Sequence, residues 1–284
     1  DLEGFYDRVA DMDVDRVYLG EVVCARKRLF GGLGPGRMEA IASKLERAGK
    51  KVVLSSLAVV SNEEELEATR QLCALGRPVE ANDMSVFNIV DPREREVTAG
   101  PHITSYNVPS VEFLAGVGVG RVVLPVELPG ESIRYMAAHS GLATEVFSHG
   151  KAPLAFSWRC YTSRAYGLDK TDCRHDCARF PDGMVVSTTE GTPVFTINGT
   201  SVLSAGTYTL VEFTDQLARA GVAAMRISPQ PEGTGEVVRI FRQRLAGAIS
   251  AEEALEGVER VSPGPVYNGW YMAGAGRDFV PRAG

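Results

Sequence analysis

The sequence lacks the features that mark membrane-spanning, secreted and nucleic-acid-binding proteins. No apolar run approaches the roughly 20 residues of a membrane-spanning helix, and no segment combines a basic start, an apolar middle and a small-residue cleavage site as a signal peptide does. The 30 basic and 36 acidic residues give a net charge of −6 without long blocks of one sign, which argues against binding to nucleic acid or anionic lipid. We therefore expect a cytoplasmic protein without a transmembrane segment, whose partners are a small-molecule substrate and other proteins.

Three common catalytic or nucleotide-binding patterns are also missing. No Gly-x-Gly-x-x-Gly follows a strand and opens a helix, and the sequence holds neither a Gly-x-Ser-x-Gly elbow nor a His-Glu-x-x-His pair. These absences argue against a dinucleotide-binding sheet, a serine hydrolase of the elbow type and a zinc protease.

What the sequence does contain is a repeated alternation of apolar strands and amphipathic helices. Strands are expected at 16–23, 51–60, 79–90, 102–106, 120–126, 145–149 and 224–228, and helices at 2–10, 37–48, 63–75, 111–115, 132–139, 208–220, 237–246 and 251–258. This alternation is typical of a parallel sheet built from strand–helix–strand units. For 284 residues with 44% hydrophobic content, it predicts one α/β domain over residues 1–284 with a TIM-barrel-like (β/α) fold. Its first strand would precede Asp1 and is expected to be missing.

Several expected strands end in a polar residue. In a barrel of this kind, the carboxyl ends of the strands converge on the face that carries the chemistry. We single out Asn107, Glu127 and His149 from these strand ends as candidate catalytic residues of one shared cavity. The alternative for each of them is that it caps a helix or holds a loop.

The strongest local pattern is a group of three cysteines, Cys160, Cys173 and Cys177. Three thiolates within so short a stretch can face one point if the intervening loop folds over it, and thiolates select zinc or iron–sulfur clusters. Zinc usually shows paired Cys-x2-Cys or mixed Cys/His spacing, which this segment lacks. A [4Fe–4S] cluster needs a fourth cysteine, and Cys24 after the strand at 16–23 is available.

Alternatives to the cluster stay open at this point. The segment could hold zinc, with His175 as a further ligand, or the cysteines could carry no metal. The fifth cysteine, Cys73, lies at apolar helical spacing and is expected to be a small core residue.

Several stretches of the sequence resemble the collagenase-like peptidase family over nearly the whole chain. They are Val17–Cys24, Lys51–Ala58, Tyr106–Asn107, Pro125–Leu128, Glu145–Gly150 with Pro153–Cys160, Arg226–Gln230 and Tyr267–Trp270. The family pattern Glu-x-Phe-x-x-Gly is followed by two cysteines, and here Pro153 replaces the first while Cys160 keeps the second. This departure is shared by a branch of the family that uses an early cysteine instead, which corresponds to Cys24.

By this resemblance, the chain would hold a [4Fe–4S] cluster on Cys24, Cys160, Cys173 and Cys177. It would pair with a UbiU-like paralogue as a heterodimer that hydroxylates the ubiquinone ring without O₂, with a lipid-binding accessory protein of ubiquinone biosynthesis as a further partner. Alternatively, the chain is a non-catalytic subunit that carries the cluster while the ring binds to the paralogue. Peptidase activity is not expected, because the protease patterns are missing.

Overall fold

The structure is a computed structural model that describes residues 2–25, 35–169 and 172–282. The chain divides into two compact units, which are described separately below. The first unit comprises residues 1–123 and 141–143, and the second comprises residues 124–140 and 144–284.

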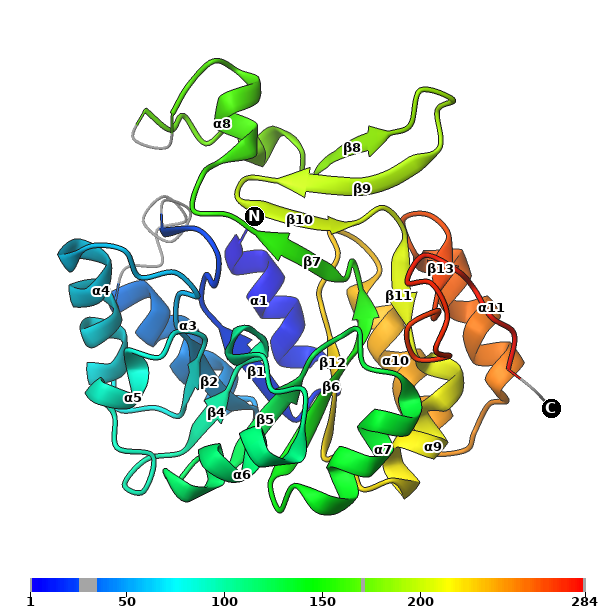
Figure 1. Cartoon of the computed structure of the whole chain (residues 1–284), viewed down its shortest axis with the longest axis horizontal. Helices are drawn as coiled ribbons and strands as arrows, with labels where there is room; N and C mark the ends of the chain where they lie inside the picture. Colours follow the sequence, from blue (N-terminus) through cyan, green and yellow to red (C-terminus); the bar gives the residue numbers. More distant parts are fainter. Residues whose placement is uncertain (1, 26–34, 170–171, 283–284) are drawn as a thin grey trace. The chain divides into compact units, whose positions relative to one another are not determined.

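The first unit is a parallel sheet in which strands alternate with helices (Figure 1). Its strands β1 to β5 pair in chain order, and the pairings among them are parallel. The elements are α1 (Leu2–Asp11), β1 (Arg16–Leu19), α3 (Pro35–Arg47), β2 (Lys51–Ser55), α4 (Glu63–Ala74), β3 (Val79–Ala81), α5 (Val86–Ile89), β4 (Val97–Ala99), the 3₁₀ helix η1 (Pro101–Ile103), α6 (Val108–Gly116) and β5 (Arg121–Leu124). The predicted alternation of strands and helices is confirmed.

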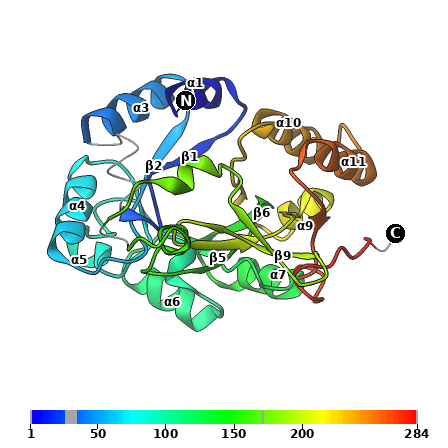
Figure 2. The same ribbon diagram turned by 90° about the horizontal axis from the view of Figure 1, so that it is seen from above.

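The two faces of this sheet differ in chemistry because successive side chains of a strand point to opposite sides. Leu54, Val79 and Val97 belong to the apolar core, which they share with residues of α1, α3, α4 and α5; these helices lie along the outer side of the strands (Figure 2). The opposite face carries the polar residues Glu80 and Thr98, which are cross-strand neighbours and are fully buried.

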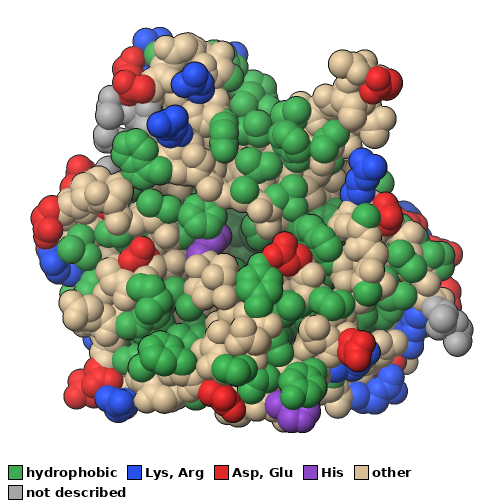
Figure 3. Space-filling model, in the orientation of Figure 1, with side chains coloured by type: hydrophobic (Ala, Val, Ile, Leu, Met, Phe, Trp, Pro, Cys, Tyr) green, Lys and Arg blue, Asp and Glu red, His purple; other side chains and the backbone are tan. Residues whose placement is uncertain are grey.

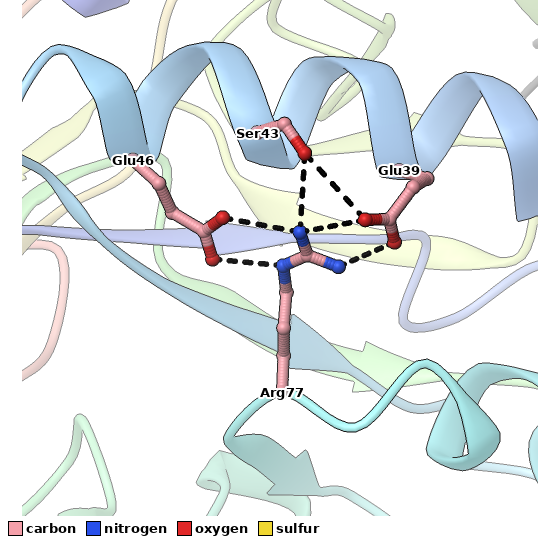
Figure 4. A network of polar contacts seen from close by, with 4 residues as sticks. All are labelled: Glu39, Ser43, Glu46 and Arg77. Carbon is pink, nitrogen blue, oxygen red and sulfur yellow. Dashed lines mark hydrogen bonds and ion pairs between the residues drawn. The ribbon is translucent and has the colours of Figure 1, made fainter.

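An arginine fork ties the start of β3 to α3. Arg77 precedes β3, and its guanidinium donates to the carboxylates of Glu39 and Glu46 and to the Ser43 hydroxyl (Figure 4). The three acceptors lie three to four residues apart along α3, so they share one helix face. The Arg77 side chain is only 13% exposed, and the two carboxylates raise its pKa.

The second unit combines two sheets with helices (Figure 1). In one sheet, β6 pairs in parallel with β12 and antiparallel with β11, which pairs with β13; the other sheet is antiparallel with the order β7-β10-β9-β8. The elements are α7 (Gly130–His139), β6 (Ala143–Gly150), β7 (Pro153–Phe156), α8 (Tyr161–Ala165), η2 (Asp176–Arg179), β8 (Met184–Ser187), β9 (Pro193–Asn198), β10 (Ser201–Ser204), β11 (Thr207–Thr209), η3 (Val211–Phe213), α9 (Thr214–Arg219), β12 (Ala224–Ile227), α10 (Thr234–Leu245), α11 (Ala251–Val261) and β13 (Val266–Tyr267).

Three predicted elements were wrong. The strand expected at 79–90 stops at Ala81, because the Asp83 carboxylate accepts the backbone N–H of Ser85 and turns the chain into α5. The strand expected at 102–106 is replaced by η1, which begins at Pro101, and the actual strand β4 lies just before it. The helix expected at 208–220 begins only at Thr214, since residues 207–209 form β11.

The fold class is therefore confirmed as mixed α/β with a parallel sheet. Within residues 2–25, 35–169 and 172–282, the strand pairings do not close a barrel. No helix in this part of the chain is long and apolar enough to span a membrane.

Candidate metal centre

Three of the four predicted ligands lie on one segment of the second unit, between β7 and β8. The segment is anchored to the turn between β9 and β10. Tyr161 N donates to Gly199 O at 2.9 Å, Gly199 N donates to Thr162 Oγ1 at 3.0 Å, and Asn198 Nδ2 donates to Phe180 O at 3.1 Å. These bonds hold α8 and the end of η2 against the same hairpin turn.

The thiols in this segment already accept backbone hydrogen bonds. Cys160 is the N-cap residue of α8, and its Sγ accepts the N–H of Ser163 at 3.3 Å. Cys173 Sγ accepts the N–H of His175 at 3.4 Å, and His175 itself adopts a left-handed backbone with φ +59°. Cys177 lies in η2, which packs against α8.

These residues fit an iron–sulfur cluster by donor chemistry. The three sulfur atoms are soft donors of the kind such a cluster needs, and Cys160, Cys173 and Cys177 are half-buried. Backbone N–H···S bonds of the kind seen at Cys160 and Cys173 are among the contacts by which proteins tune such clusters. In the described part of the chain, no three His, Cys, Asp or Glu side chains are grouped as for a bound metal ion.

Cys24 and Cys73 lie in the first unit. Cys24 is 6% exposed and ends a turn after β1, in which Glu21 Oε1 accepts the backbone N–H groups of Val23 and Cys24 at 3.1 and 3.2 Å. Cys73 is 2% exposed on α4 and belongs to the apolar core, as predicted from its helical spacing.

His149 lies at the end of β6 and is fully buried. Its Nε2 faces Gln230 Oε1 at 3.5 Å and its Nδ1 faces Thr209 Oγ1 at 3.4 Å. The Gln230 amide nitrogen donates to the carbonyls of Glu232 and Val261, both at 2.7 Å. The amide oxygen therefore faces the ring and accepts a hydrogen bond from Nε2–H. Burial lowers the pKa of His149 to about 4, so the ring is a neutral Nε2–H tautomer at neutral pH.

The other two candidate catalytic residues have different surroundings. Asn107 is the exposed N-cap residue of α6 in the first unit, and its Oδ1 accepts the N–H and hydroxyl of Ser110, each at 2.9 Å. In the structure Asn107 therefore caps a helix, which is the alternative to a catalytic role given above. Glu127 is exposed in the turn between β5 and α7, in the second unit.

Two buried polar contacts were not predicted from the sequence. Glu80, which is 1% exposed, accepts the Ser55 hydroxyl at 2.7 Å and the Asn82 amide at 3.1 Å. In the second unit, Arg226 on β12 donates to Glu145 on β6 at 3.2 Å. For Glu80, the signal in the sequence was a glutamate inside an otherwise apolar strand; β6 contains further polar residues beside Glu145, so that signal was weaker there.

The comparisons with known proteins bear on family and fold. A solved structure of a single-residue variant of the O-GlcNAc hydrolase of Thermobaculum terrenum is similar to 90% of this chain, with 8% sequence identity and a TM-score of 0.45. The match covers 58% of that chain. The sequence profile of peptidase family U32 matches residues 4–278, which is nearly the whole sequence, and the chain therefore belongs to peptidase family U32.

Proposed function

We propose that this chain is the [4Fe–4S] subunit of a heterodimeric, O₂-independent hydroxylase in ubiquinone biosynthesis, similar to UbiV, and that it acts with a UbiU-like paralogue. The observation that carries the proposal is the set of three half-buried thiols on one anchored segment of a U32 family member. The pattern of U32 cysteines supports it further, because Pro153 stands in place of one family cysteine and Cys24 offers a substitute.

The chain's own residues would hold the cluster and limit its exposure. Cys160, Cys173 and Cys177 would supply thiolates from the second unit and Cys24 one from the first. Negative charge on Cys160 and Cys173 would be stabilised by the N–H groups that already point at their sulfur atoms. A bound cluster of this kind supplies one-electron transfer.

Asn107, Glu127 and His149 remain our candidates for contact with the reacting ring. The exposed Glu127 carboxylate can accept a proton, and Asn107 presents an amide at the start of α6. His149 would act as a neutral hydrogen-bonding group and not as a base, because burial keeps its pKa near 4.

The test is to purify the protein without oxygen and to measure iron and acid-labile sulfide per chain. Wild type should contain both in about equal amounts, and Cys160→Ala and Cys24→Ala should lose most of both while far-ultraviolet circular dichroism stays native. Cys73→Ala is the matched control, since this buried cysteine lies in the apolar core and should keep its iron. Zinc without sulfide in the wild type, or full iron in Cys24→Ala, would contradict the proposal.

A further inference from the structure

Five large hydrophobic side chains are exposed on the stretch that carries Cys160. Leu154 is 42% exposed, Phe156 39%, Trp158 50%, Tyr161 38% and Tyr166 42%. We call this set the aromatic face. It runs from β7, the edge strand of its sheet, through the N-cap of α8 to the residue after α8. Hydrophobic side chains gather over this part of the second unit, near α8 and β9, in the upper part of Figure 3.

The composition of this stretch is that of a protein–protein interface. Residues 152–168 contain no Asp, Glu or Lys, and their only charged side chains are Arg159 and Arg164, which are both exposed. Aromatic residues and Arg are enriched at the centres of protein interfaces, whereas Lys, Glu and Asp are depleted there. The absence of Asp, Glu and Lys from these 17 residues contrasts with the 23% charged residues of the whole chain.

The exposed area is also of the right size. The five exposed fractions together correspond to about two fully exposed aromatic side chains, or about 400 Å² of mainly apolar surface. A stable interface buries about 800 Å² on each partner, of which somewhat more than half is apolar. The aromatic face alone would therefore supply nearly all the apolar part of one side.

We infer that the aromatic face is the docking surface for the paralogous subunit, an inference that rests on the heterodimer of the proposed function. Arg159 and Arg164 lie within this stretch, and the Arg179 guanidinium lies over the Tyr166 ring, 5.7 Å from its centroid. The partner should therefore present an apolar centre with carboxylates opposite these arginines. The position of Cys160 within the face and of Cys177 on η2, which packs against α8, places the thiol segment beside the interface. Docking would then shield the cluster from solvent.

The experiment measures binding of the purified chain to the separately purified UbiU-like paralogue from the same genome, without oxygen. Leu154→Glu puts a charge at the β7 end of the face. Trp158→Ser removes the most exposed aromatic ring of the face, which lies after the end of β7. Each should raise the Kd at least about 30-fold, with native circular dichroism and wild-type iron content. The matched control is Phe113→Glu on α6, where Phe113 is 64% exposed, and it should bind like wild type.

The outcomes separate this inference from the proposed function. If wild type does not bind the paralogue, both are wrong. If wild type binds and Leu154→Glu and Trp158→Ser bind equally well, the heterodimer stands and the docking surface is elsewhere. Iron loss to a chelator should be slower in the wild-type heterodimer than in the chain alone, and equal rates would count against an interface beside the cluster. If wild type binds vesicles of phosphatidylcholine and phosphatidylserine and Trp158→Ser does not, the face binds lipid and the inference fails.

Discussion

His149 should stay neutral far below the pH at which an exposed imidazole binds its proton. Burial lowers its pKa from 6.5 to about 4, and the ring already has one donor contact to Gln230 and one acceptor contact to Thr209. A second proton would sit on Nδ1, inside the core and beside the T-shaped contact with Phe241. Desolvation therefore opposes the charged ring more strongly than the hydrogen bond to Gln230 favours it.

The difference between the pKa of His149 in the folded chain and in the unfolded chain makes the stability of the fold depend on pH. The unfolded chain binds a proton at the ordinary pKa of 6.5 and the folded chain only near 4, so the unfolded state holds more protons between these values. The free energy of unfolding must then fall as the pH is lowered through this window, and the His149 contribution is constant above it. The two pKa values differ by an amount that corresponds to about 3 kcal/mol, and about 2 kcal/mol of this is lost between pH 7 and pH 5.

The assay has a spectroscopic part and a thermodynamic part. The chain has four histidines, so ¹⁵N-edited NMR can resolve their rings, and His149→Gln identifies the signal of His149. That signal should show the Nε2–H tautomer and titrate near pH 4. In urea unfolding, His149→Gln should lose about 2 kcal/mol less than wild type between pH 7 and pH 5. A titration midpoint near 6.5, or an Nδ1–H tautomer, would refute the reasoning.

Two further predictions concern the first unit. Gly100→Ala would place a Cβ in overlap with Asn82 Oδ1 and 2.8 Å from Asn82 Cγ, so urea unfolding should show a loss of about 2 kcal/mol; Gly116→Ala, with no atom within 4 Å of the added Cβ, should show no loss. Arg77→Lys keeps the charge but loses the planar fork to α3 and should cost about 1 kcal/mol. The exposed Arg70 pairs with the carboxylates of Glu63 and Glu67 on its own helix, so Arg70→Lys should leave the urea midpoint unchanged, and equal effects of the two substitutions would contradict this reading.

Elements with a clear cap and a clear period could be predicted from the sequence. The helix expected at 63–75 is α4 (Glu63–Ala74), because Asn62 caps it by accepting the N–H of Glu65 and three acidic residues occupy its first turn. The prediction of a strand at 79–90 was wrong for an equally local reason. An aspartate side chain that bonds to the backbone two residues on can end a strand in the middle of an apolar run.

The antiparallel sheet β7-β10-β9-β8 could not be predicted in the same way. Its strands are only four to six residues long, and apolar side chains project from both faces, as Val185 and Val186 do on successive positions of β8. Alternation of polar and apolar residues is the signal for a strand with one buried face, and this sheet does not have it. The cysteines stood out in the sequence because metal ligation restricts residue type and spacing more than packing does, and their role as ligands stays a prediction.

The surroundings of His149 could not be predicted from the sequence either. The residues that set its tautomer, Thr209 and Gln230, lie 60 and 81 positions further along the chain. A histidine at a strand end is compatible with catalysis or with a core contact, and only the tertiary structure shows which groups face its two nitrogens. The prediction of a catalytic role stays open, but the role of a general base near neutral pH is disfavoured by burial.

The sheet β7-β10-β9-β8, which carries the thiol segment, is joined to β6 and β11 by two short connections that hydrogen-bond to each other. Ala152 N donates to Ser204 Oγ at 2.9 Å, Ser204 N donates to Ala152 O at 2.9 Å, and Ser204 Oγ donates to Gly206 O at 2.7 Å. These bonds link the connection between β6 and β7 to the connection between β10 and β11. Both Ala152 and Ser204 are buried. A metal site gains affinity when its ligands are held in place before binding. These hydrogen bonds limit how far the sheet β7-β10-β9-β8 can move relative to β6, and under the proposed function they would help to hold Cys160, Cys173 and Cys177 in place for a cluster.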